Sequence, residues 1–127
     1  MPYTLEWYVP GRVILERAFG DVTVEELVQL NAEVTTIIAS EGIAPVHAIL
    51  DLTDIGKYPT SIRDILGTMR QTVPGKEGWI LVVTQSAMLN FFASIIFQVA
   101  RLRVRVFPTL PEAVAYLGVV DETFAHC

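Results

Sequence analysis

The chain has 127 residues, of which 52% are hydrophobic and 18% are charged, and its net charge is −5. This length fits one globular domain, so we expect a single domain over residues 1–127, with a core over 3–118 and a tail over 119–127. Lys and Arg never occur side by side, which argues against a nucleic-acid-binding surface. The low charge content predicts either a large core or apolar surface reserved for a partner.

Cellular location is constrained by what the sequence lacks. Cys127 is the only cysteine, so it forms no internal disulfide, and no Cys/His cluster suggests a metal site. Residues 1–12 do not resemble a signal peptide. Three polar residues interrupt the one long apolar segment, 86–102, which is shorter than the roughly 20 residues of a membrane span. We therefore expect a cytoplasmic protein without stable membrane insertion, cofactor or metal.

The elements begin with a hairpin. Residues 3–9 and 12–19 alternate as strands do, and Pro10-Gly11 between them is a turn signal. The capping-box pair Thr23 and Glu26 opens a helix that runs to about Gly42. Further elements follow in chain order: a buried strand over 45–52, a helix over 62–73, a strand over 78–85, a helix over 87–102, a strand over 104–108 and a helix over 110–118.

This order, β-β-α-β-α-β-α-β-α, predicts an α/β fold. Right-handed crossovers between successive strands give a mixed, mostly parallel five-stranded sheet, and four helices cover it. The opening hairpin supplies the antiparallel strand.

The residues offer little for catalysis. His47 lies inside a predicted strand, where a single histidine is usually structural, and no nucleophile motif or phosphate-binding loop occurs. Asp51 and Asp54 follow a predicted parallel strand, at the end where α/β folds place their sites. They either hold a metal or a partner's Arg, or bond nearby backbone N–H groups, and we favour the second role. We expect no catalytic residue, and an enzyme using this pair is the weakest hypothesis.

Ser61 begins the predicted helix over 62–73, with Asp64 three residues on and Thr60 beside it. This is a capping pattern worth about 1 kcal/mol. A hydroxyl at a helix start is also a place where a phosphate can be accommodated, and its roughly two negative charges can break or make an interface.

The element order, the Asp51-Leu52 strand end and the late segment VRVFPTLPEAVAYL resemble the STAS domain family, the fold of SpoIIAA-type bacterial anti-sigma-factor antagonists. In that family a D-S-[ST]-G motif follows the strand, and a partner kinase phosphorylates its hydroxyl residue. The resemblance implies that Ser61 takes this position, with Thr60 beside it. Pro59 and Ile62 replace the acidic residue and the glycine of the motif. The resemblance to the family also implies a regulatory partner of the kinase or anti-sigma-factor type.

The helix over 87–102 is apolar around most of its circumference. Its polar residues form one narrow stripe, whereas a helix that covers a sheet needs only one apolar face. The apolar surface beyond that one face is either buried within the domain, used in a homodimer, or used to bind a lipid-like ligand or membrane surface. The residues predicted to form a dimer or apolar-ligand surface are Leu89, Phe91, Phe92, Ile96 and Phe97.

The leading hypothesis is a non-enzymatic, STAS-like regulatory domain that acts through protein contacts, as a homodimer or through a signalling partner. The alternative is a binding module for a small apolar or lipid-like ligand.

Overall fold

The structure is a computed structural model that describes residues 3–61, 63–64, 75–100 and 103–121. Within these ranges, some side chains also lie outside the description: Glu77, Ile96, Phe97, Val99 and Ala100. The described elements are β1 (Tyr3–Val9), β2 (Val13–Ala18), α1 (Val24–Glu41), β3 (Val46–Asp51), β4 (Glu77–Val83), α3 (Ala87–Ala100), β5 (Val104–Phe107) and α4 (Leu110–Val120).

Three helices are described where the sequence predicts four. The remaining predicted helix, over 62–73, lies outside the described residues apart from Arg63 and Asp64, which are helical. The helix at the end of the chain runs two residues further than predicted, to Val120.

The sheet has five strands in the order β1-β2-β3-β4-β5. β1 pairs antiparallel with β2, and the other neighbouring pairs are parallel, which confirms the predicted mixed, mostly parallel sheet. The β1–β2 turn closes with a bond of 2.9 Å from the Arg12 N–H to the Val9 carbonyl. Gly11 has a φ of +74°, which a residue with a Cβ adopts only with strain.

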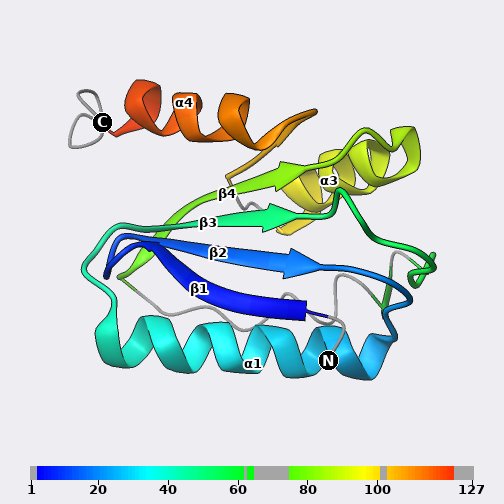
Figure 1. Ribbon diagram of the computed structural model, residues 1–127, viewed down its shortest axis with the longest axis horizontal. Coiled ribbons are helices and arrows are strands. Elements are labelled where there is room, and N and C mark those ends of the chain that lie inside the picture. The colour runs from blue at the N-terminus through cyan, green and yellow to red at the C-terminus, as the bar shows by residue number, and fades with distance from the viewer. Residues whose placement is uncertain (1–2, 62, 65–74, 101–102, 122–127) are drawn as a thin grey trace.

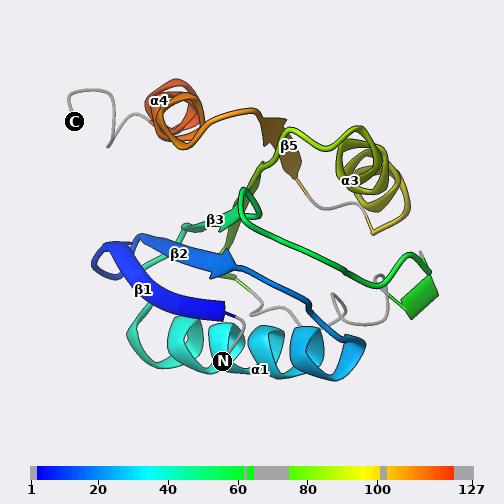
Figure 2. The same cartoon turned by 45° about the vertical axis from the view of Figure 1, so that its right-hand side comes forward.

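Successive side chains of a strand point to opposite faces of the sheet. Apolar side chains lie on both faces here, and helices cover both. α4 lies on one face and packs Ala113 and Leu117 against Val13, Ile49 and Leu81. α1 and α3 lie on the other face (Figures 1 and 2). Strands covered on both sides are mostly apolar, as residues 48–50 of β3 and 79–83 of β4 are.

Side-chain caps begin α1, as predicted, and α4. The Thr23 hydroxyl accepts from the Glu26 N–H while the Glu26 carboxylate accepts from the Thr23 N–H, which completes a capping box at α1. At α4, the Thr109 hydroxyl accepts from the Glu112 N–H. Among the described residues, no helix has both the length and the hydrophobicity to cross a membrane.

Candidate functional site

The candidate site is built on residues 52–61, which follow β3 and are called the β3 loop here. This loop runs beside the chain that connects β2 to α1. The Gly20 N–H donates to the Asp54 carbonyl at 3.2 Å, and the Gly56 N–H donates back to the Gly20 carbonyl at 2.7 Å. The Val22 N–H continues the pattern by donating to the Lys57 carbonyl at 2.8 Å. Backbone bonds therefore fix the first half of the loop like a short extra strand.

Gly56 is required by this close pairing. A Cβ on Gly56 would lie 2.6 Å from the Asp21 carboxylate and 3.1 Å from the Gly20 backbone. The same Asp21 carboxylate accepts from the Lys57 N–H at 2.8 Å. The turn thus packs backbone against backbone with no room for a side chain.

The two aspartates of the predicted pair have separate surroundings. Asp51 is half-buried, and its Oδ1 accepts from both the N–H (3.0 Å) and the hydroxyl of Thr53. Its Oδ2 lies 4.0 Å from the Arg17 Nε. Asp54 is exposed and contributes its backbone carbonyl to the loop pairing. Asp51 thus bonds Thr53, two residues further along the chain. The described residues hold no group of three or more potential metal ligands.

Thr60 and Ser61 end the β3 loop, and both are exposed. The Ser61 hydroxyl accepts from the Asp64 N–H at 3.3 Å, which is the bond of a helix cap. Its oxygen is therefore held at a helix start and is open to solvent.

A cavity of about 150 Å³ lies on the α1 and α3 side of the sheet. The second half of the β3 loop borders it with Tyr58 and Pro59, and α3 borders it with Leu89, Phe92 and Ala93. The loop and α3, which are far apart in sequence, therefore meet around one cavity.

The five residues predicted to form an apolar surface on α3 separate in the structure. Leu89 and Phe92 are 9% and 8% exposed and line the cavity. Phe91 is 59% exposed and points away from the core, as does Met88 at 50%. The side chains of Ile96 and Phe97 lie outside the described part of the chain.

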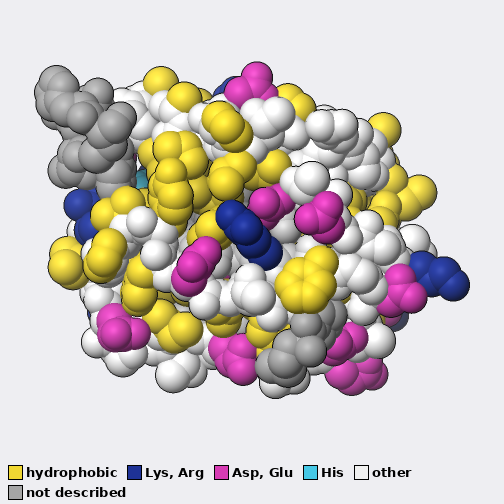
Figure 3. Space-filling model, in the orientation of Figure 1, with side chains coloured by type: hydrophobic (Ala, Val, Ile, Leu, Met, Phe, Trp, Pro, Cys, Tyr) yellow, Lys and Arg dark blue, Asp and Glu magenta, His cyan; other side chains and the backbone are white. Residues whose placement is uncertain are grey.

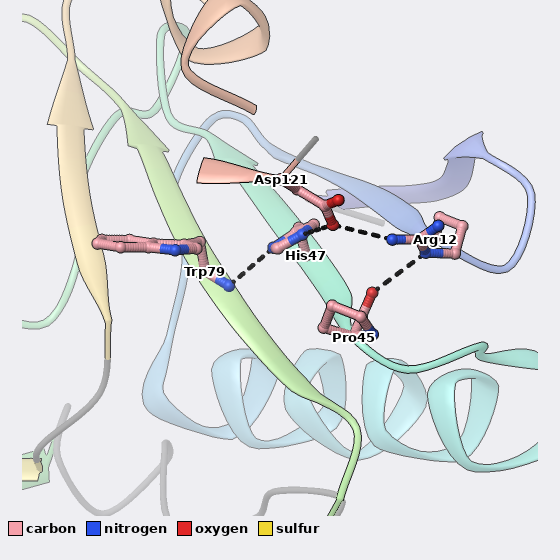
Figure 4. A network of polar contacts seen from close by, with 5 residues as sticks. All are labelled: Arg12, Pro45, His47, Trp79 and Asp121. Carbon is pink, nitrogen blue, oxygen red and sulfur yellow. Dashed lines mark hydrogen bonds and ion pairs between the residues drawn. The ribbon is translucent and has the colours of Figure 1, made fainter. Parts of the chain in front are cut away.

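A polar network at the opposite end of the sheet was not predicted (Figure 4). Asp121 Oδ2 lies 2.9 Å from both His47 Nε2 and an Arg12 guanidinium nitrogen. The Trp79 N–H donates to His47 Nδ1 at 3.0 Å, so the ring proton resides on Nε2 and is donated to Asp121. His47 thus joins β3, β4 and the end of α4.

One residue of the sequence, Gly78, indicates this network. A Cβ on Gly78 would lie 2.7 Å from His47 Nδ1, so a glycine in β4 makes room for the imidazole of β3. Nothing in the pattern of the chain end singles out Asp121.

Glu16 is a second residue that was not predicted from the sequence to belong to a site. It lies in the middle of β2, half-buried, and lines the cavity among apolar side chains. Burial raises the pKa of its carboxyl from an ordinary 4.5 to about 7.

Basic side chains form no patch on the face of the molecule in Figure 3, where they are scattered among acidic and hydrophobic ones.

Comparison with known proteins gives matches in structure alone. No family model matches the chain, and no curated protein matches it significantly in sequence. A protein of the DUF3478 family from Shewanella loihica PV-4, described as having a SpoIIAA-like fold, is 13% identical over 91% of this chain and 93% of its own, with a TM-score of 0.66.

Two anti-sigma factor antagonists match similarly. Unphosphorylated SpoIIAA is 20% identical over 93% of this chain and 97% of its own, with a TM-score of 0.61. An antagonist from Mycobacterium paratuberculosis is 14% identical over 93% of both chains, with a TM-score of 0.56. These matches confirm the resemblance that the element order indicated: the chain has the α/β fold of SpoIIAA-like, STAS-type proteins.

Proposed function

We propose that this protein is a non-enzymatic regulatory domain that acts through protein contacts. Its contact face comprises the exposed side chains Met88 and Phe91 of α3 together with Thr60 and Ser61 of the β3 loop. The observation that carries this proposal is the exposure of Phe91, at 59%, on a helix that meets the β3 loop around one cavity. Large aromatic side chains are enriched where proteins bind one another.

The occupant we propose for the α3 part of this face is a second copy of the chain. The net charge of −5 makes two copies repel one another over most of their surface. α3 is the exception, because residues Ala87–Ala100 include no charged side chain. Two α3 helices can therefore approach without bringing like charges together.

Regulation is proposed to act at Ser61. SpoIIAA is known in unphosphorylated and phosphorylated forms. The Ser61 hydroxyl is exposed and lies two residues beyond Pro59, which lines the cavity that α3 also borders. A phosphoryl group there would add about two negative charges to the edge of the contact face and would weaken an apolar association.

Mass spectrometry tests this modification. The wild-type protein incubated with ATP and an extract of the source cells is expected to gain one phosphate on the peptide that contains Ser61, and Ser61→Ala is not. Phosphate that persists in Ser61→Ala, or that appears on neither protein, contradicts the regulatory role of Ser61.

Sedimentation velocity tests the association itself. Phe91→Asp places a charge on the apolar face, so it is expected to shift a self-associating protein to the monomer. Val119→Asp is the matched control, because Val119 is 76% exposed but lies on α4, across the sheet. Equal association of both variants and the wild type would contradict a contact through α3.

A second candidate function is the binding of a small apolar molecule. The cavity of about 150 Å³ favours it, because two of the predicted ligand-surface residues, Leu89 and Phe92, line that cavity. The lining of the cavity also includes the carboxyl group of Glu16.

A further inference from the structure

Glu16 occupies a row of the sheet that is otherwise apolar. In register, Leu5 of β1, Glu16 of β2, Leu50 of β3 and Val82 of β4 lie side by side. These residues point toward the α1 and α3 side, where Leu50 and Val82 line the cavity with Glu16. A carboxyl group in the middle of such a row is costly to bury, so packing alone does not explain its presence.

The carboxyl of Glu16 has no partner within the described part of the chain. No hydrogen bond or ion pair joins it to a described residue, and burial is the cause that raises its pKa to about 7. The neighbouring cation, Arg17, lies on the other side of the strand, 4.0 Å from Asp51. Among the described residues that line the cavity, no other side chain is charged, and Tyr58 is the only other one that titrates.

The size of the cavity limits what it holds. Its volume of about 150 Å³ equals that of an engineered protein cavity that binds benzene. A single ring or a short alkyl chain therefore fits. Asn31 of α1 also lines the cavity, and its amide oxygen is a second acceptor for a donor group of the ligand.

We propose that this cavity binds a small apolar molecule that carries one amine. The ammonium group pairs with the Glu16 carboxylate, and the hydrocarbon part packs between the sheet and the α3 side chains Leu89 and Phe92. The inference rests on the second candidate function and names its ligand class. Binding sites of this kind are mostly apolar and use a few polar groups to fix orientation.

An amine fits better than other polar groups because it supplies what Glu16 lacks. A charge-assisted bond between an ammonium and a carboxylate in an apolar site is stronger than a bond to a neutral alcohol. A carboxylic acid ligand would place a second carboxyl beside the first, and one of the two would have to remain protonated.

Three compounds of the same shape test the proposal: benzylamine, benzyl alcohol and toluene. At about pH 8, where Glu16 is mostly ionised, isothermal titration of the wild-type protein is expected to show benzylamine binding about tenfold more tightly than benzyl alcohol. Glu16→Gln keeps the shape of the side chain and removes its charge. This variant is expected to lose the preference for benzylamine and to retain toluene binding.

Glu6→Gln is the matched control, because Glu6 lies on β1, is exposed and is outside the cavity lining. It is expected to bind all three compounds as the wild type does. Circular dichroism confirms that each variant is folded. A second measurement needs no variant: as Glu16 gains its proton between about pH 8 and pH 6, wild-type affinity for benzylamine falls and that for toluene stays constant.

The outcomes separate the two claims. Equal affinity for benzylamine and benzyl alcohol, or a preference for benzylamine that survives in Glu16→Gln, overturns the assignment of an amine while toluene binding upholds the apolar site. No binding of any of the three compounds overturns both the second candidate function and this inference.

Discussion

At the scale of single residues, Glu16 is a carboxyl group in a strand that otherwise contributes apolar side chains to the core, and it lines the cavity. The strand that carries it is otherwise well suited to a core, with Val13, Ile14 and Leu15 all at most 3% exposed. Burial leaves this carboxylate with less of the water that stabilises its charge, and this loss favours the protonated form.

The stability of the protein is therefore expected to depend on pH through Glu16. The pKa of its carboxyl is about 7 in the folded protein and 4.5 ordinarily, so the unfolded chain releases this proton more readily. The contribution of Glu16 to the free energy of unfolding is most favourable below pH 4.5 and is lost as the pH rises through 7. At pH 8, Glu16→Gln is expected to raise the free energy of unfolding by roughly 1–3 kcal/mol.

Urea unfolding of the wild type and Glu16→Gln at about pH 5 and about pH 8 measures this difference. The difference in the free energy of unfolding between the two proteins is expected to be large at about pH 8 and smaller at about pH 5. A difference that does not change with pH would show that Glu16 is ionised in the folded protein throughout.

At the scale of elements, α4 is joined to the sheet at both ends of its packing face. Ala113 and Leu117 are 0% and 2% exposed against the sheet. Asp121, the residue after the helix, then bonds Arg12 at the start of β2 and His47 in β3. The end of the last helix is thus connected to the first hairpin.

Asp121→Ala removes the acceptor of the His47 Nε2 proton, and His47 is only 2% exposed. Because a buried donor that loses its acceptor is costly, the free energy of unfolding is expected to fall by about 1–3 kcal/mol. Asp54→Ala is the control, since Asp54 is exposed and uses its backbone carbonyl in the loop. If urea unfolding shows equal losses for the two variants, the network does not hold α4.

The structure divides the apolar surface of α3 in a way that periodicity does not predict. Leu89 and Phe92 face the cavity, whereas Met88 and Phe91 face outward. Because the helix is apolar around most of its circumference, its sequence pattern does not distinguish the packed face from the free one. The facing elements determine that division.

At the scale of the whole molecule, the element order and the mixed sheet could be predicted because they depend on local signals. Turn glycines, capping residues and the periodicity of apolar side chains act within a few residues of one another. The position of the β3 loop at the carboxyl end of β3 also follows from the topology.

The parts that could not be predicted arise from contacts between distant residues. Asp121 reaches His47 across 74 positions, and no local pattern records such a contact. Glu16 follows three apolar residues of β2 that are buried on both faces of the sheet, so alternation does not show that it faces a cavity.

The contact face on α3 is the central claim, and the weight-average mass in solution at high micromolar concentration tests it most directly. The monomer has a mass of 14.1 kDa. The wild type is expected to rise toward twice this mass as its concentration increases, and Phe91→Asp is expected to remain at the monomer mass. A wild-type protein that stays at 14.1 kDa throughout the series would contradict the proposed association.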